Sequence, residues 1–216
     1  VSGLIAQQQC VGPFHTPISN YSITKLSFCD NIGVVTSIGE QPIKGLLDNR
    51  SSIEMTVGEM LTNLIFVKIS AFEDIKCLGN WMWSSKIPGQ DKLLYEAVII
   101  LKDTLKSLKI AIDGGKDSLS MNTKVNDEIV MSPNTLVLSS YCVCPNINKK
   151  VTPDLKGNGN VLLFIDLSYQ NYRLGGSIFS QEINKLGTNA PKFENIHRFP
   201  YIFKLIQQFI QNNKIL

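Results

Sequence analysis

The chain has 216 residues, of which 44% are hydrophobic and 18% are charged, and its formal net charge is +3. This balance is typical of a globular protein and gives no bias toward nucleic acid or a membrane as a partner. The longest apolar runs fall far short of the roughly 20 residues of a membrane-spanning helix, and the N-terminus lacks the basic and apolar regions of a secretion signal.

The five cysteines cannot all pair within the chain because their number is odd. Cys142 and Cys144 are two residues apart, which places both on one face of a strand, and this spacing is not that of a zinc knuckle. We interpret the cysteines as reduced, structural thiols rather than metal ligands. Such thiols indicate a reducing compartment, and we expect the protein to be cytoplasmic.

The first half of the chain predicts strands followed by two helices. Residues 1 to about 40 alternate apolar and polar side chains between turn sequences such as VGPFHTP, a pattern typical of strands and loops. Apolar side chains recur at helical spacing from Ser51 to about Ile69 and again from Asp91 to Lys109. Between these helices, DIKCLGNWMW predicts a strand that runs into a loop.

The first of these helices carries a polar face. Glu59 and Asn63 are four residues apart, so their side chains lie one turn from each other. A carboxylate and an amide oxygen presented together suit Mg²⁺, which prefers oxygen ligands. The alternative is a solvated polar face that includes Ser52 and Thr56, although Phe66 continues this face and indicates that part of it is covered.

After the second helix, KIAID predicts a short strand that leads into the glycine-rich loop IDGGKDSLSM. Asp117 stands where the P-loop pattern needs Ser or Thr, and Ser118 stands where the dinucleotide fingerprint needs a third glycine. Two interpretations remain open. Gly114 and Gly115 supply the positive φ of a tight turn, or their bare backbone lets N–H groups approach an anion beside a lysine and serine hydroxyls.

Further along the chain, TLVLSSYCVC predicts a strand, and the polar stretch from 145 to 160 predicts a hinge between domains. VLLFIDLS predicts a buried strand, and IFSQEINKLG predicts a helix closed by Gly187. The RLGGS turn before that helix indicates either an anion site or a turn capped by Ser177. An amphipathic run, FPYIFKLIQQFIQNN, follows. Strands and helices alternate without a strict βαβ repeat, so we expect an α+β fold with a mixed or antiparallel sheet.

Several long segments are informative together. They are, in order, GLIAQQQCVGP, TSIGEQPIKGLLD, VGEMLTNLIF, IKCLGNWMW, DGGKDSLSM, YCVCP, VTPDL and RLGGS. These segments resemble phosphoribosylformylglycinamidine synthase, the amidotransferase family of purine synthesis, in its large multidomain form. That form contains two tandem repeats similar to aminoimidazole ribonucleotide (AIR) synthetase, followed by a glutaminase domain. This chain resembles the second repeat. The resemblance implies an AIR-synthetase-like N-terminal domain at 1–145, a linker at 146–160 and an incomplete C-terminal α+β domain at 161–216.

The resemblance also implies an ATP-dependent ligase, of which this chain is a fragment that is inactive alone. The family converts formylglycinamide ribonucleotide, ATP and glutamine into formylglycinamidine ribonucleotide, ADP, phosphate and glutamate, with Mg²⁺ neutralising phosphate charge. The implied partners are this ribonucleotide, ATP, the first synthetase repeat and the glutaminase domain. The implied site residues are Ser19, Gly115 and Lys116 for ATP, Ser118 for the substrate, and Asn20, Glu59 and Asn63 for the metal, with no catalytic residue in the fragment.

Two positions depart from the family pattern. The family has an aspartate where this chain has Asn20, which keeps an oxygen ligand but loses a charge, so we expect weaker metal binding. Stand-alone bacterial forms have a metal-binding asparagine where this chain has Lys116, and we assign this lysine to phosphate. The metal set resembles the auxiliary, structural nucleotide site of the large enzymes. A non-catalytic scaffold protein is an alternative that Asn20 leaves open. Another enzyme of the AIR-synthetase superfamily is a further alternative, which NWMW and GGKDSLSM oppose.

Overall fold

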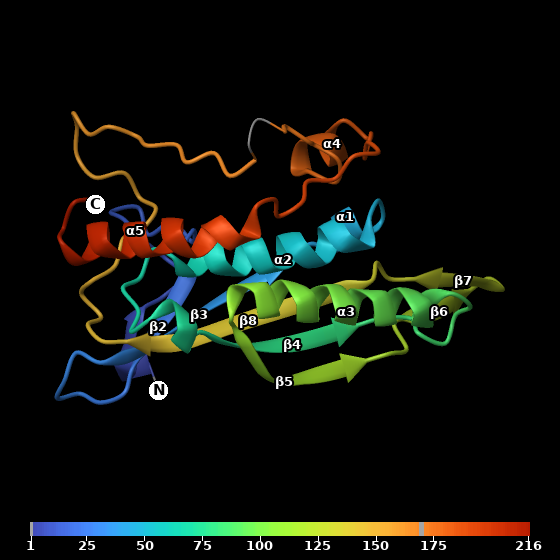
Figure 1. Ribbon diagram of the computed structural model, residues 1–216, viewed down its shortest axis with the longest axis horizontal. Coiled ribbons are helices and arrows are strands. Elements are labelled where there is room, and N and C mark those ends of the chain that lie inside the picture. The colour runs from blue at the N-terminus through green and yellow to red at the C-terminus, as the bar shows by residue number, and fades with distance from the viewer. Residues whose placement is uncertain (1, 169–170) are drawn as a thin grey trace.

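The computed structural model describes residues 2–168 and 171–216. Its main sheet has the strand order β1-β2-β3-β8-β4-β5 (Figure 1). The β4–β5 pair is parallel, and the other described pairs of this sheet are antiparallel. The strands are β1 (Ile5–Gln7), β2 (Tyr21–Lys25), β3 (Gly33–Glu40), β4 (Lys76–Met82), β5 (Ala111–Ser118) and β8 (Thr135–Cys144). This mixed sheet with flanking helices confirms the predicted α+β class.

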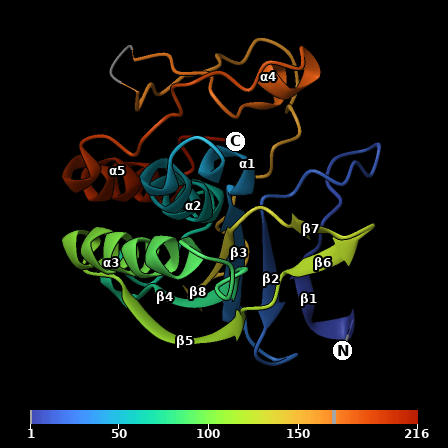
Figure 2. The same cartoon turned by 90° about the vertical axis from the view of Figure 1, so that its right-hand side faces the viewer.

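Two long helices, α2 (Asn49–Leu64) and α3 (Gln90–Leu108), lie side by side against one face of the sheet (Figure 2). Within the described part of the chain, no helix covers the opposite face. A third helix, α5 (Phe199–Gln211), lies along the outer side of α2. The short helical elements are α1 (Pro42–Gly45), α4 (Ile178–Glu182), η1 (Ser2–Leu4), η2 (Phe72–Asp74) and η3 (Ile196–Arg198).

Both long predicted helices are confirmed. Asp48 caps the start of α2 by accepting a hydrogen bond from the backbone N–H of Arg50. The helix ends at Leu64, earlier than the predicted end near Ile69, because the following backbone bonds to a distant segment. The side chain of Gln207 on α5 donates to the carbonyl oxygens of Ile65 and Val67, both at 2.8 Å. These bonds replace the helical hydrogen bonds that the residues would otherwise make.

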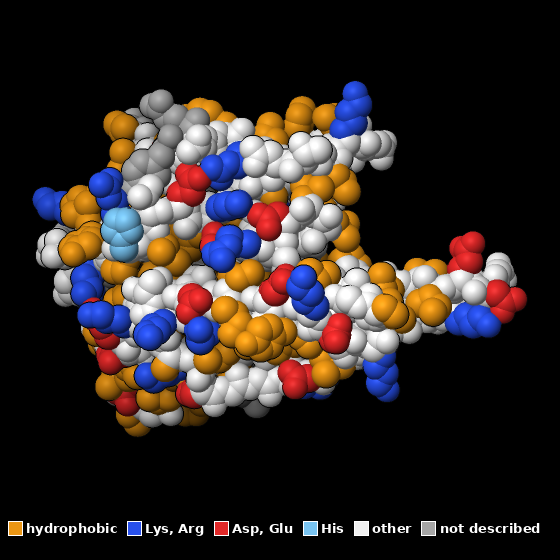
Figure 3. Space-filling model, turned by 45° about the vertical axis from the view of Figure 1, so that its right-hand side comes forward, with side chains coloured by type: hydrophobic (Ala, Val, Ile, Leu, Met, Phe, Trp, Pro, Cys, Tyr) orange, Lys and Arg blue, Asp and Glu red, His pale blue; other side chains and the backbone are white. Residues whose placement is uncertain are grey.

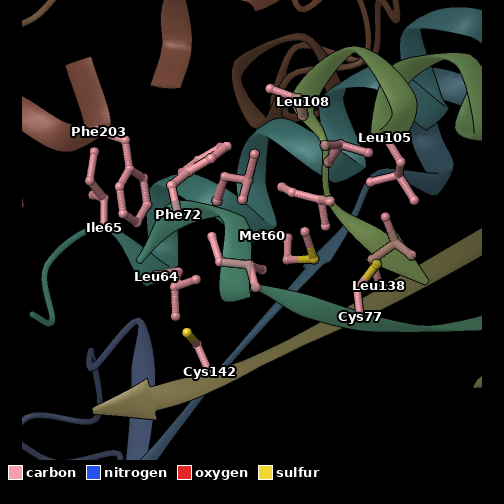
Figure 4. Packing of buried hydrophobic residues seen from close by; sticks show 14 of the residues in the cluster. Met60, Leu64, Ile65, Phe72, Cys77, Leu105, Leu108, Leu138, Cys142 and Phe203 are labelled. Atoms are coloured by element: carbon pink, nitrogen blue, oxygen red, sulfur yellow. The ribbon is translucent and has the colours of Figure 1, made fainter. Parts of the chain in front are cut away.

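The hydrophobic core lies between the sheet and the α2–α3 layer, and it continues under α5 (Figure 4). Met60 of α2 and Leu105 of α3 point toward Leu138 of β8, and Leu64 of α2 points toward Cys142 of the same strand. Three of the five cysteines are part of this core: Cys77, Cys142 and Cys144. Burial raises the pKa of each of these thiols, so they are held as neutral apolar groups at neutral pH.

A second, smaller sheet was not predicted. β6 (Asn122–Val125) and β7 (Glu128–Met131) form an antiparallel hairpin that projects from the body of the molecule and carries charged side chains at its tip (Figure 3). The two residues between the strands, Asn126 and Asp127, both have positive φ. This conformation is that of a two-residue hairpin turn, which asparagine and aspartate adopt more readily than other non-glycine residues.

Three local predictions are wrong. The stretch IDGGKDSLSM does not form a loop at its glycines, because β5 continues through Gly114 and Gly115 in parallel pairing with β4. VLLFIDLS is not a buried strand: it has no regular structure, and Leu162 is 80% exposed. The helix after Ser177 ends at Glu182, well before Gly187, so this glycine does not close it.

The segment after the predicted hinge returns to the first part of the chain. α5 packs through Phe203 against Phe72, with the two rings at 5.0 Å in an edge-to-face arrangement. The predicted amphipathic run is therefore a helix whose apolar side joins the common core. The division into domains at 1–145 and 161–216 stays a prediction. Among the described residues, no helix has the length and apolar character to cross a membrane.

Candidate functional site

The predicted metal ligands Glu59 and Asn63 lie at an edge of β3 that its neighbouring strand leaves open. β2 begins at Tyr21, which pairs with Ser37, so the residues of β3 beyond Ser37 have no partner from β2. Side chains of α2 take that place. The Asn63 amide donates to the carbonyl oxygen of Ile38 at 2.9 Å, and the backbone N–H of Glu40 donates to Oε2 of Glu59 at 2.8 Å.

A glycine allows α2 to approach this edge. A Cβ atom on Gly39 would lie 2.2 Å from the carbonyl oxygen of Thr56 and 2.6 Å from the backbone nitrogen of Met60, so no larger residue fits. Next to it, the Ser37 hydroxyl, which is buried, donates to the carbonyl oxygen of Met60 at 2.7 Å. The backbones of β3 and α2 are thus in direct contact at this point. This contact places the side chain of Glu59 next to the end of β3.

The face of α2 that carries these ligands is not a solvated surface. Ser52 and Thr56, on the same face, are both buried. Glu59 and Asn63 are partly exposed at its end. The solvated alternative therefore does not describe this face: the helix presents it to β3 and to the start of α1, and only the end that carries Glu59 and Asn63 reaches solvent. Metal binding by these two residues stays a prediction.

A further side chain, which the sequence did not single out, completes the arrangement. Nε2 of Gln41 donates to Oε2 of Glu59 at 2.8 Å, so this oxygen accepts from two donors. The Lys44 ammonium group donates in turn to Oε1 of Gln41. Burial lowers the pKa of Lys44, and the charge of Glu59 opposes that effect. We refer to Gln41, Glu59 and Asn63 as the β3-edge cluster.

The oxygen atoms left over in the β3-edge cluster fit a hard cation. Oε1 of Glu59 and the side-chain oxygen of Asn63 make no hydrogen bond with the described residues. A carboxylate oxygen and an amide oxygen are the ligand types that Mg²⁺ takes, with water and phosphate oxygens filling the other positions. Asn20 directly precedes Tyr21 and so lies at the same end of the β2–β3 pair. The Ser19 hydroxyl is engaged locally, because it donates to the carbonyl oxygen of Tyr21 at 2.7 Å.

The other predicted residues lie together on β5. Lys116 and Ser118 are two apart on this exposed strand and share a face, where the lysine Nζ lies 3.0 Å from the serine hydroxyl oxygen. Gly115 has a packing reason for being glycine, since a Cβ there would lie 2.4 Å from the carbonyl oxygen of Gly79 on β4. The strand pair therefore needs this glycine whether or not a ligand approaches it.

The two groups lie at the same end of the sheet. Glu40 of β3 pairs with Val137 of β8, Val137 pairs with Asn80 of β4, and Asn80 pairs with Lys116 of β5. Three strand spacings separate the ends of this row, which corresponds to about 14 Å. The structure therefore brings Glu59 and Asn63 together on the α2 side of the sheet. It brings Lys116 and Ser118 together on the opposite face, because they pair with Asn80 and Met82, which point away from the core.

The RLGGS turn is a capped turn rather than an anion site. The backbone N–H groups of Gly175, Gly176 and Ser177 donate to the carbonyl oxygens of Asn189, Leu186 and Leu174, respectively. The Ser177 hydroxyl accepts from the backbone N–H of Ser180 and so caps α4. No N–H group of these three residues is left to bind a phosphate, and the helix that follows has one turn only.

Comparison with known proteins assigns this architecture to a family. The profile described as FGAR-AT PurM_N-like domain matches residues 1–143. The phosphoribosylformylglycinamidine synthase of Drosophila melanogaster is 47% identical over 219 residues, an alignment that spans 100% of this chain and 16% of that protein. The protein of the same name from Homo sapiens is 42% identical over 215 residues, which cover 98% of this chain and 16% of that protein.

A solved structure has the same fold. The structure of PurLQS from Thermotoga maritima aligns with 71% of this chain and 23% of its own, with a TM-score of 0.51 and 17% sequence identity. This likeness shows the fold alone. The chain spans about 16% of the length of the curated relatives it matches, and the resemblance inferred from the sequence segments is confirmed along nearly all of it.

Proposed function

The chain belongs to the FGAR-AT PurM_N-like family, and on this premise we propose that it is part of a phosphoribosylformylglycinamidine synthase. The proposed reaction is the ATP-dependent conversion of formylglycinamide ribonucleotide and glutamine into formylglycinamidine ribonucleotide, ADP, phosphate and glutamate. The observation that supports it best is the pairing of two unlike groups at one end of the sheet. One offers oxygen ligands, and the other offers a cation and a hydroxyl.

Each group has a distinct proposed role. Glu59 and Asn63, with Asn20 at the neighbouring strand end, would hold Mg²⁺, and this ion would neutralise nucleotide phosphate charge when bound. Asn20 contributes no negative charge, so this metal set is weaker than one with an aspartate there. Lys116 would contact phosphate, and Ser118 would donate a hydrogen bond to the ribonucleotide substrate. Ser19 and Gly115 would border the nucleotide.

The rest of the same protein is the proposed partner of this chain. The sheet face that no described helix covers carries exposed apolar side chains on three strands: Ile38, Leu78 and Val143. A face of this kind is buried in most assembled proteins. We assign its covering to segments beyond this chain, because the relatives are about six times as long. The buried, un-ionised thiols accord with a reducing compartment such as the cytosol.

The test is a kinetic comparison in the full-length protein. Wild-type protein should form ADP only when formylglycinamide ribonucleotide is present. Ser118→Ala should raise the KM for this substrate about tenfold, which corresponds to the loss of one hydrogen bond to a polar ligand. Ser107→Ala on α3 removes a serine hydroxyl that bonds only to its own helix, and it should leave the KM unchanged. ADP formation that does not depend on the ribonucleotide would refute the proposed function.

A further inference from the structure

The two carboxylate oxygens of Glu59 are not equivalent. Oε2 accepts hydrogen bonds from the backbone N–H of Glu40 and from Nε2 of Gln41, both at 2.8 Å. Oε1 has no hydrogen-bond partner among the described residues. A carboxylate oxygen that already accepts two hydrogen bonds has little capacity left for a cation. Only Oε1 is therefore available to a metal ion.

The orientation of Gln41 is determined by its other contacts. Lys44 can only donate hydrogen bonds, so the end of the Gln41 amide that it contacts must be the oxygen. The NH₂ end then faces Glu59. The backbone of Gln41 is also held, because the buried Ser52 hydroxyl donates to its carbonyl oxygen at 2.8 Å. A lysine, a glutamine and a carboxylate thus form a chain in which each donor direction is set by its neighbour.

Asn63 is oriented by the same strand. Its amide nitrogen donates to the carbonyl oxygen of Ile38, which turns the amide oxygen away from β3. Residues 38 to 41 therefore select Oε1 of Glu59 and orient the single amide oxygen of Asn63. This arrangement does not depend on a bound ion, because the hydrogen-bond donors are groups of the protein.

From this arrangement we infer that Gln41 is a positioning residue that restricts Glu59 to one metal-binding oxygen and so makes the site selective for Mg²⁺ over Ca²⁺. The inference rests on the proposed cation site. Mg²⁺ is small and is bound by single carboxylate oxygens together with water, whereas Ca²⁺ takes more ligands and often both oxygens of one carboxylate. Because Oε2 of Glu59 is occupied by two hydrogen bonds, Glu59 offers one oxygen. One oxygen suits Mg²⁺, whereas Ca²⁺ would lack a ligand at this site.

The experiment measures ion selectivity rather than activity. Mn²⁺ binding to the full-length protein is followed by the electron paramagnetic resonance of free Mn²⁺, and the site that disappears in Glu59→Gln is assigned to this cluster. Mg²⁺ and Ca²⁺ are then titrated as competitors. In Gln41→Met, a side chain of similar length without a donor, Mg²⁺ should bind about tenfold more weakly, as is typical when a partner of a metal ligand is removed. Ca²⁺ should bind as well as before or more tightly.

Gln181→Met is the matched control, because the side-chain amide of Gln181 bonds only within the turn before α4 and its loss should leave both ions unaffected. An unchanged Mg²⁺-to-Ca²⁺ ratio in Gln41→Met, with the Glu59-dependent site intact, would overturn the inference and leave the proposed function standing. Absence of any Glu59-dependent Mn²⁺ site would remove the proposed cation site and the inference with it. If Gln41→Met does not fold, Lys44→Met is tested instead. Its ratio of Mg²⁺ affinity to Ca²⁺ affinity should fall by less than is expected for Gln41→Met, and an unchanged ratio refutes the inference.

Discussion

Gly39 shows how one residue positions a site whose ligands lie elsewhere. Its backbone meets α2 so closely that the missing side chain is what allows the Glu40 N–H to reach Glu59. Gly115 has the same property against Gly79, although the sequence suggested a turn or an anion contact there. At both positions a glycine is required by the approach of two backbones. A single sequence does not show whether a glycine is required by close backbone packing or by a bound ligand, because both require a residue without a side chain.

Substitution of Gly39 should be far more harmful than substitution of a nearby buried glycine. Gly39→Ala forces a Cβ against backbone atoms that cannot move aside, and we expect a loss of about 3 kcal/mol in the free energy of unfolding. Gly58→Ala is the control: its Cβ would lie 3.5 Å from the ring of Phe193, an ordinary contact within a helix. It should be neutral or stabilise by up to about 1 kcal/mol. Urea denaturation of both variants measures the difference, and equal effects would contradict this account.

At the scale of elements, α5 is fixed to the first part of the molecule by two kinds of contact. Gln207, which is buried, bonds to the backbone that leaves α2, through Ile65, Val67 and Ile69. Phe203, which is fully buried, packs on Phe72 of η2. The amphipathic pattern of α5 predicts a helix with one apolar side. The surface that receives this side was not predictable, because it is built from residues more than a hundred positions earlier.

Removal of the central ring of this contact should destabilise the whole chain. Phe203→Ala leaves a cavity between α5 and η2, and we expect a cost of about 3 to 5 kcal/mol. Tyr201→Ala, two residues away on the same helix, removes an aromatic ring that is 76% exposed and should change stability by about 0.5 kcal/mol or less. Thermal unfolding followed by circular dichroism at 222 nm compares the two. A Phe203→Ala protein as stable as wild type would mean that α5 is not part of the cooperative unit.

At the scale of the whole molecule, the segment from 161 to 165 is the clearest disagreement between sequence and structure. Its residues are apolar and favour a strand, yet Val161 is 90% exposed and Phe164 is 82% exposed. The prediction of a buried strand is wrong for this segment, because the described residues supply no partner strand for it. A run of this composition that stays exposed is prone to pair with other chains.

We therefore expect the 216-residue chain to self-associate through this segment. Replacement of Leu162 and Phe164 by serine should shift sedimentation velocity profiles toward the monomer and leave the free energy of unfolding within about 0.5 kcal/mol, because both side chains are exposed. The matched control replaces Phe14 and Leu155, which are also exposed but lie outside the run. Self-association that persists in the first variant and disappears in the control would contradict this expectation.

The sequence by itself determined the α+β class, both long helices, β8 as a strand, and the pairing of Glu59 with Asn63 on one helix face, because each depends on periodicity within a short window. It also carried the family resemblance, which long shared segments preserve. Only the tertiary structure decided that the glycine stretch is a strand, that the N–H groups of Gly175, Gly176 and Ser177 are all bonded within the fold, and that Gln41 and Lys44 orient Glu59. Those outcomes depend on contacts between segments far apart in the chain, where the hydrogen-bond partner of a group is set by packing and not by its neighbours in sequence.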